Sequence, residues 1–82
     1  MMKAHVYVTP KPSVLDPQGQ TIHNALRKIG YSQVEGVRQG KYFVLSLADG
    51  LSGDDARTKV EKIARDVLTN PVIEEFTYRI EE

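Results

Sequence analysis

Cysteine and long apolar runs are both absent from this 82-residue sequence. Without cysteine, the chain carries no disulfide framework, thiolate nucleophile or thiolate metal site. A transmembrane helix needs about 20 consecutive apolar residues, and no run approaches that length. A strand pattern begins at Lys3, which leaves no place for a signal peptide. We therefore expect a cytoplasmic protein without membrane contacts.

Net charge is also lacking, because eleven Lys and Arg residues balance eleven Asp and Glu residues. A nucleic-acid-binding domain usually has a basic surplus or a dense basic patch. Here residues 1–41 hold six basic and two acidic residues, whereas residues 42–82 hold five and nine. Complementary halves of this kind favour protein partners over nucleic acid.

The length predicts a single domain spanning residues 1–82. A hydrophobic fraction of 40% and a charged fraction of 27% are typical of soluble globular domains. A domain of this size buries only about two thirds of the surface of its unfolded chain. Self-association or a partner would supplement its stability.

Hydrophobic periodicity predicts the first two elements. Residues 3–9 alternate, with Ala4, Val6 and Val8 on one face of a strand. From Pro17 the period becomes that of a helix, and Gly30 follows at the position of a left-handed C-cap. The apolar residues of this helix form a single stripe: Ile22, Ala25, Leu26 and Ile29.

The remaining pattern completes a β-α-β-β-α-β order. Residues 33–39 and 41–47 read as a hairpin turning at residues 39–40. Ser52 caps a second amphipathic helix, which ends before residues 70–71, and a last alternating strand follows. This order predicts an α+β, ferredoxin-like fold: a four-stranded antiparallel sheet with two helices on one face.

Candidate catalytic groups have no partners in the sequence. His5 and His23 lack ligands at metal-binding spacing, and the acidic pairs at 74–75 and 81–82 point to opposite strand faces. The loop at residues 10–15 has no arginine, which excludes an acylphosphatase. We predict no catalytic, cofactor-binding or metal-binding residue in this chain.

Tyr7 and Tyr42 are predicted on the open face of the sheet, where RNA-recognition modules stack bases. The missing positive charge argues against RNA. We favour a half-apolar face that another protein surface covers.

Residues 16–19, Asp-Pro-Gln-Gly, open the first helix. Asp16 and Pro17 form a start signal, but Gly19 in the first turn costs about 1 kcal/mol relative to alanine. An anion site is disfavoured because Asp16 already occupies the free N–H groups. We therefore interpret Gly19 as a place where another chain approaches closely.

Four motifs carry a resemblance to a known family. They are residues 3–8 (Lys-Ala-His-Val-Tyr-Val), 14–19 (Val-Leu-Asp-Pro-Gln-Gly), 37–42 (Val-Arg-Gln-Gly-Lys-Tyr) and 70–74 (Asn-Pro-Val-Ile-Glu). Over essentially its whole length the chain resembles PurS, the small subunit of bacterial phosphoribosylformylglycinamidine (FGAM) synthase. It departs from the family pattern at Ser13, where glycine is common, and in the loop at residues 49–53.

The resemblance implies a part in de novo purine biosynthesis. FGAM synthase is an ATP-dependent, glutamine-hydrolysing C–N ligase, in which a glutaminase subunit (PurQ) releases ammonia and a large synthetase subunit (PurL) activates an amide oxygen with ATP. PurS-like chains form homodimers, possibly dimers of dimers, that bridge these two subunits and assist ammonia transfer. They are not catalytic themselves, and ATP, Mg and glutamine are used by the partner subunits.

Two alternatives stay open at this point: a small-ligand regulatory (ACT-like) module and an RNA-binding domain of the same topology. The residues that we predict at a protein interface are Tyr7, Asp16, Pro17, Gln18, Gly19, Arg38, Gly40, Lys41, Tyr42, Asn70 and Pro71.

Overall fold

The computed structural model describes residues 2–82, so Met1, the first residue of the predicted 1–82 domain, lies outside it. The elements, in chain order, are β1 (Lys3–Pro10), α1 (Pro17–Lys28), β2 (Lys41–Ser46), α2 (Gly53–Ile63), the π-helical turn η1 (Ala64–Leu68) and β3 (Glu74–Glu81). In this described part, no helix is long and apolar enough to cross a membrane.

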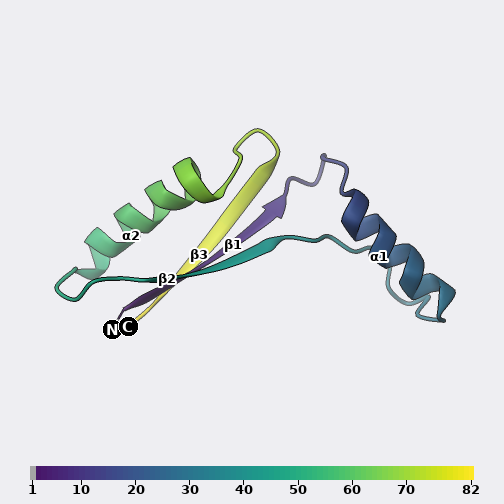
Figure 1. Cartoon of the computed structure of the whole chain (residues 1–82), viewed down its shortest axis with the longest axis horizontal. Helices are drawn as coiled ribbons and strands as arrows, with labels where there is room; N and C mark the ends of the chain where they lie inside the picture. The colour runs from purple at the N-terminus through teal and green to yellow at the C-terminus, as the bar shows by residue number, and fades with distance from the viewer. Residues whose placement is uncertain (1) are drawn as a thin grey trace.

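Within residues 2–82, the three strands form one antiparallel sheet in the order β2-β1-β3 (Figure 1). The central strand β1 pairs with β2 from Lys3↔Ser46 to Val8↔Lys41. It pairs with β3 from Lys3↔Glu81 to Pro10↔Glu74. The outer edges of β2 and β3 therefore have no hydrogen-bonded neighbour among the described strands.

The core lies between β1 and α2. The alternation predicted for the first strand is confirmed, because Ala4, Val6 and Val8 are fully buried. Against them pack buried small side chains that let α2 and the following turn η1 approach the sheet closely: Ala56 and Val60 in α2, and Ala64 in η1. The predicted cap of this helix is also confirmed, since the Ser52 hydroxyl accepts a hydrogen bond of 3.1 Å from the N–H of Asp55.

The predicted fourth strand is wrong. Residues 33–39 pair with no strand and continue the line of β2 away from the sheet, so the chain does not turn back at residues 39–40. Gly40 lacks the positive φ of a tight hairpin turn. A Cβ on Gly40 would lie well inside van der Waals contact with the carbonyl oxygen of Val8, so glycine is needed where the chain runs close to β1.

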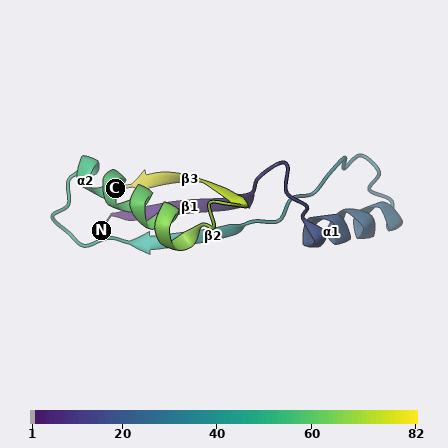
Figure 2. The same ribbon diagram turned by 90° about the horizontal axis from the view of Figure 1, so that it is seen from above.

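The placement of both helices on one face of the sheet is also wrong. We call residues 11–40, which include α1, the arm. Figures 1 and 2 show α2 along the sheet and the arm beyond one end of it. The described chain measures 51 × 26 × 14 Å, and its radius of gyration is 16.2 Å, against about 12 Å for a compact chain of this length.

Local signals inside the arm behave as predicted. Helix α1 begins at Pro17, directly after Asp16, and ends before Gly30, whose φ of 103° is the left-handed conformation of a C-cap. The expected helix stop at residues 70–71 is confirmed as well, because Thr69 is extended and the chain turns into β3 there. The errors therefore concern the missing strand at residues 33–39 and the place where the arm packs, and not the formation of the two helices.

Candidate subunit interface

The carboxylate of Asp16 joins the start of α1 to the end of the arm. Its Oδ1 accepts a hydrogen bond of 3.0 Å from the N–H of Gly19, as a helix cap does. Its Oδ2 accepts one of 2.7 Å from the N–H of Gln39, which lies 23 positions further along the chain. Only 8% of Asp16 is exposed. The predicted cap is confirmed, and it also acts as a clamp between two segments.

Arg38 makes a second clamp at the same place. Its guanidinium donates to the carbonyl oxygens of Lys11 (2.6 Å) and Val14 (3.0 Å). Beside it, Gln39 donates through its side-chain amide to that of Gln18, at 2.8 Å. Both clamps join the first residues of the arm to its last residues. The two ends of the arm are therefore held together at its base.

The hydrogen bonds to Asp16 favour its charged form. The N–H groups of Gln39 and Gly19, and then the charge of Arg38, hold the pKa of the Asp16 carboxyl below its usual value. A lowered pKa contributes stability that is present above the pKa of the unfolded chain, about 4, and is lost as the pH falls through the folded-state value.

We therefore expect acid to loosen the arm through Asp16. Lowering the pH from 7 to 3 should reduce the free energy of unfolding more in the native protein than in Asp16→Asn, because asparagine still caps α1 but does not titrate. Urea unfolding of both proteins at the two pH values measures this difference. Identical losses in the two proteins would remove Asp16 as the acid-sensitive group.

Gly19 is explained within the chain itself. A Cβ at this position would lie well inside van der Waals contact with the carbonyl oxygen of Val37 and 2.5 Å from Oδ2 of Asp16. The bare backbone is thus needed for the close approach of residues 37–39 of the same chain. The interpretation that another chain makes this approach is corrected, although a role of Gly19 at a subunit interface stays a prediction.

Gly19→Ala is expected to destabilise the arm, although alanine raises helix propensity by about 1 kcal/mol. Displacing a backbone carbonyl by overpacking costs typically about 1–3 kcal/mol, so the net change is unfavourable. The matched control is Gly36→Ala, because a Cβ at Gly36 meets nothing within 4 Å. Hydrogen exchange of the α1 amides should accelerate in the first variant only. Equal exchange rates in both variants would contradict the clamp.

The open face of the sheet carries a stacked aromatic cluster. The ring centroids of Tyr7 and Tyr42 lie 5.1 Å apart with an interplanar angle of 16°, and the ring of His5 stacks with that of Tyr42 at 5.9 Å. Tyr7 is 40% exposed and Tyr42 is 55% exposed. Since the tyrosines stack on each other, their ring faces are not free to hold successive bases, which argues further against RNA.

His5 has partners that the sequence did not reveal. Its Nε2 donates to Oε1 of Glu81 at 2.6 Å, and its Nδ1 lies 2.5 Å from the hydroxyl of Tyr42. This histidine is only 8% exposed, and it lowers the pKa of the Glu81 carboxyl by a hydrogen bond and by charge. Glu81 is 76 positions away in sequence, so only the pairing of β1 with β3 brings the two residues together.

The other predicted interface residues lie at the end of the sheet next to the arm. Lys41 begins β2 and forms an ion pair of 3.4 Å with Glu74. Asn70 and Pro71 make the turn into β3. The hydrogen bond from the N–H of Asn70, and to a smaller extent the ion pair with Lys41, lowers the pKa of the Glu74 carboxyl. The structure therefore groups the candidate residues around the base of the arm, with Tyr7 and Tyr42 on the neighbouring open face.

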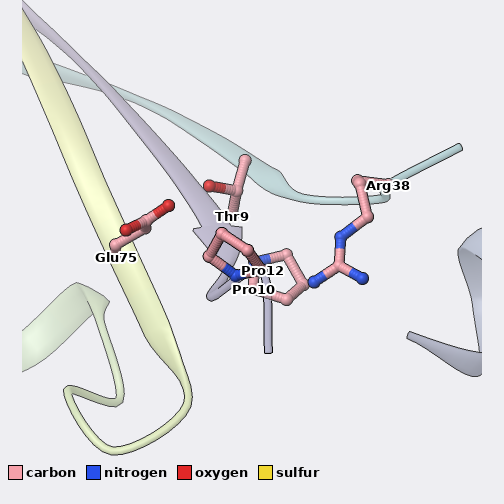
Figure 3. Close-up of a pocket in the computed structure, with 5 residues that line it drawn as sticks. All are labelled: Thr9, Pro10, Pro12, Arg38 and Glu75. Carbon is pink, nitrogen blue, oxygen red and sulfur yellow. The ribbon is translucent and has the colours of Figure 1, made fainter. Parts of the chain in front are cut away.

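A cleft of about 360 Å³ opens between the base of the arm and β3 (Figure 3). Thr9 and two prolines form its floor, and the charged side chains of Arg38 and Glu75 stand at its two sides.

Across residues 2–82, no group of three or more His, Cys, Asp or Glu side chains is placed to hold a metal ion. The architecture is that of a small α+β protein in which, among the described residues, helix α1 of the arm buries only Gly19.

Comparison with known proteins identifies the family. The family model described as "PurS: Phosphoribosylformylglycinamidine (FGAM) synthase" matches residues 3–82. The PurS subunit of Bacillus subtilis is 42% identical over 82 residues, covering 100% of this chain and 95% of the relative. The PurS subunit of Mycobacterium leprae is 42% identical over 77 residues, covering 94% and 92%.

Solved structures agree with the sequence matches. A crystal structure of B. subtilis PurS has a TM-score of 0.86 at 41% identity and covers 100% of both chains. PurS of Methanocaldococcus jannaschii has a TM-score of 0.87 at 30% identity, covering 100% of this chain and 98% of that one. A structure of PurLQS from Thermotoga maritima has a TM-score of 0.76 at 25% identity, with 99% of both chains covered.

The chain belongs to the PurS family and is a small subunit of FGAM synthase. The resemblance that the four sequence motifs indicated is confirmed over residues 3–82.

Proposed function

We propose that this chain is a non-catalytic, homodimeric subunit that bridges the glutaminase and synthetase subunits of FGAM synthase and assists ammonia transfer. The observation that carries the proposal is the arm. Helix α1 presents an apolar stripe, yet Gly19 is its one buried residue, which supports a packing partner from another chain.

The bridging role is supported by a relative. The T. maritima structure is named as PurLQS, a complex of PurS with PurL and PurQ, and its PurS-like chain superposes on 99% of this one. A bridge needs at least two surfaces. This chain offers the open sheet face around Tyr7 and Tyr42 and the cluster of interface residues around the base of the arm.

The division of labour follows from the same proposal. Glutamine is hydrolysed by the glutaminase subunit, and ATP and Mg are used by the synthetase subunit. This chain then supplies contacts rather than reacting groups, and it works in the cytoplasm as one domain.

The open face gives a direct prediction. Tyr42→Ala removes a ring that stacks on two neighbours, and we expect it to weaken capture of the partner subunits at least about tenfold, the effect of losing one interface hot spot. Tyr42→Phe keeps the ring and should retain most of the binding. Lys59→Ala, on the exposed side of α2, is the control.

The test is a co-purification of the tagged chain with purified synthetase and glutaminase, followed by titration of each variant. The expected result is that both partners are recovered with the native chain and with Lys59→Ala. If neither partner is recovered with the native chain, the bridging role is lost. If Tyr42→Ala binds as tightly as the native chain, the open face is not the contact.

A second candidate function has one specific observation in its favour. The cleft at the base of the arm places Arg38 and Glu75 on opposite sides, which suits a zwitterionic ligand such as an amino acid. A small-ligand regulatory module would bind there. Calorimetry against a panel of amino acids and nucleotides separates the two functions, because the bridging proposal expects no heat of binding for the isolated chain.

A further inference from the structure

The hydroxyl of Tyr42 belongs to a line of hydrogen bonds that joins all three strands. The imidazole of His5, on the central strand β1, bonds to the Tyr42 hydroxyl on β2 at 2.5 Å and to the Glu81 carboxylate on β3 at 2.6 Å. His5 is only 8% exposed, whereas Tyr42 is 55% exposed. A buried histidine therefore connects a carboxylate on one outer strand to an exposed hydroxyl on the other.

Glu81 fixes which nitrogen of His5 carries the hydrogen. The hydrogen bond from His5, and then its charge, hold the pKa of the Glu81 carboxyl below its usual value, so this group is ionised at neutral pH. An ionised carboxylate has no hydrogen to donate, so Nε2 of His5 must be the donor. In a neutral imidazole the other nitrogen then carries no hydrogen. Nδ1 is therefore the acceptor, and the hydroxyl of Tyr42 donates to it.

Protonation of His5 reverses the bond to Tyr42. An imidazolium carries a hydrogen on both ring nitrogens and accepts at neither. Nδ1 then donates to the oxygen of Tyr42, and the hydrogen of this hydroxyl turns away from His5. Because more than half of Tyr42 is exposed, that hydrogen is presented on the open face of the sheet.

Charges of both signs surround His5. The titratable and charged side chains on this face come from the three strands: Lys3 and Tyr7 on β1, Tyr42 on β2, and Arg79 and Glu81 on β3. The carboxylate of Glu81 attracts a proton to His5, whereas the cations of Lys3 and Arg79 repel it. Helix α2 packs on the other face of the sheet, against Val6 and Val8. Histidine is the side chain that changes charge between about pH 5 and 8, so measurements at these two pH values compare its two forms.

We propose that His5 determines which kind of group a partner subunit places opposite Tyr42. With His5 neutral, the Tyr42 hydroxyl uses its hydrogen within the chain and offers only oxygen lone pairs. The matching group of the partner is then a hydrogen-bond donor, such as a backbone N–H, a lysine or an arginine. With His5 protonated, two donors face each other. The inference rests on the proposed function, in which the open face contacts a partner subunit, and it specifies the chemistry of that contact.

Binding at two pH values tests the inference. A donor left unsatisfied in an interface weakens binding, and we expect the native chain to capture its partner about tenfold less tightly at pH 5 than at pH 8, after division by the same ratio for Tyr42→Phe. Tyr42→Phe keeps the ring but has no hydroxyl, so its ratio contains every other titration, including those of the partner subunits. Equal ratios for the native chain and Tyr42→Phe would overturn the inference.

The two histidines provide a matched pair of variants. Glutamine in His5→Gln can donate to Glu81 and accept from Tyr42 but does not titrate, so this variant should show the ratio of Tyr42→Phe. His23 lies in α1, and its Nε2 bonds to the carbonyl oxygen of Val34 at 2.8 Å. His23→Gln removes a titrating group elsewhere and should keep the ratio of the native chain. A His5→Gln variant that also keeps the native ratio would refute the role of His5.

Spectroscopy of the chain alone distinguishes a failure of this inference from a failure of the proposed function. The tyrosine doublet in ultraviolet resonance Raman spectra reports whether a phenol donates or accepts, and the native spectrum minus that of Tyr42→Phe isolates Tyr42. We expect a shift from the donor pattern at pH 8 toward the acceptor pattern at pH 5. An unchanged doublet overturns the inference even if both partner subunits bind. A shifted doublet in a chain that captures neither subunit refutes the bridging role, and the partner contact inferred for Tyr42 falls with it.

Discussion

A Leu26→Asp variant is expected to be a folded monomer. The substitution places a carboxylate in the centre of the apolar stripe of α1, where docking on another chain would bury it without a partner. An unpaired buried charge costs about 3–5 kcal/mol, which corresponds to a dimer dissociation constant more than roughly 100-fold weaker. The sheet and α2 should stay folded, because α1 does not contribute to their core.

Two measurements and one control decide this prediction. Sedimentation equilibrium gives the mass of the particle, and circular dichroism shows whether the helices and the sheet persist. Asn24→Asp adds the same charge on the exposed side of α1 and should remain a dimer. A Leu26→Asp protein that keeps the dimer mass would contradict the role of α1 in assembly.

The second large effect is expected in the reaction of the complex. Glutamine-dependent FGAM formation by the synthetase and glutaminase subunits should fall by about 100-fold or more when this chain is left out. Linking two binding events through a bridge raises the overall avidity by roughly 10²–10⁴-fold, and that gain is lost without the bridge. The reaction supplied directly with ammonium salt should proceed unchanged, since it needs no transfer between subunits.

The Leu26→Asp variant tests whether the dimer is needed for this reaction. Adding Leu26→Asp should restore the glutamine-dependent rate poorly, whereas Asn24→Asp should restore it fully. If leaving out the chain slowed the ammonium-supplied reaction to the same extent, the chain would take part in the synthetase chemistry. That outcome would refute the non-catalytic assignment.

Much of the local structure follows from the sequence because it depends on neighbours in the chain. The alternation of Ala4, Val6 and Val8 gives β1 its buried face, and the Asp16–Pro17 pair starts α1 one residue after the cap. Ser52 and Gly30 likewise act at the ends of helices, where each needs only a few adjacent residues.

The arm could not be predicted in this way. An apolar stripe shows that a helix packs, but it does not show whether the surface belongs to the same chain. The hairpin at residues 39–40 was a reasonable expectation, because segments with compatible patterns pair equally well within one chain or between two. The choice depends on whether the chain turns back at Gly40, and the close approach of Gly40 to Val8 is a tertiary contact that leaves no local signal.

The predicted interface residues show the same difference between local signals, which the sequence reveals, and long-range contacts, which it does not. Asp16 was recognised as a cap, but its second bond to Gln39 spans 23 positions and leaves no local signal. The sequence showed no partner for His5, because Tyr42 and Glu81 lie 37 and 76 positions away. Gly19 was correctly singled out as a close approach, and only the structure shows that Val37 of the same chain makes it.

In the proposed function, this chain holds the glutaminase and synthetase subunits together. Sedimentation velocity of fluorescently labelled glutaminase, mixed with the synthetase in the presence of glutamine and ATP, tests it most directly. The labelled protein is expected to sediment with the synthetase only after this chain is added, and not after Leu26→Asp is added. Equal association of the two subunits with and without the chain would contradict the bridging role.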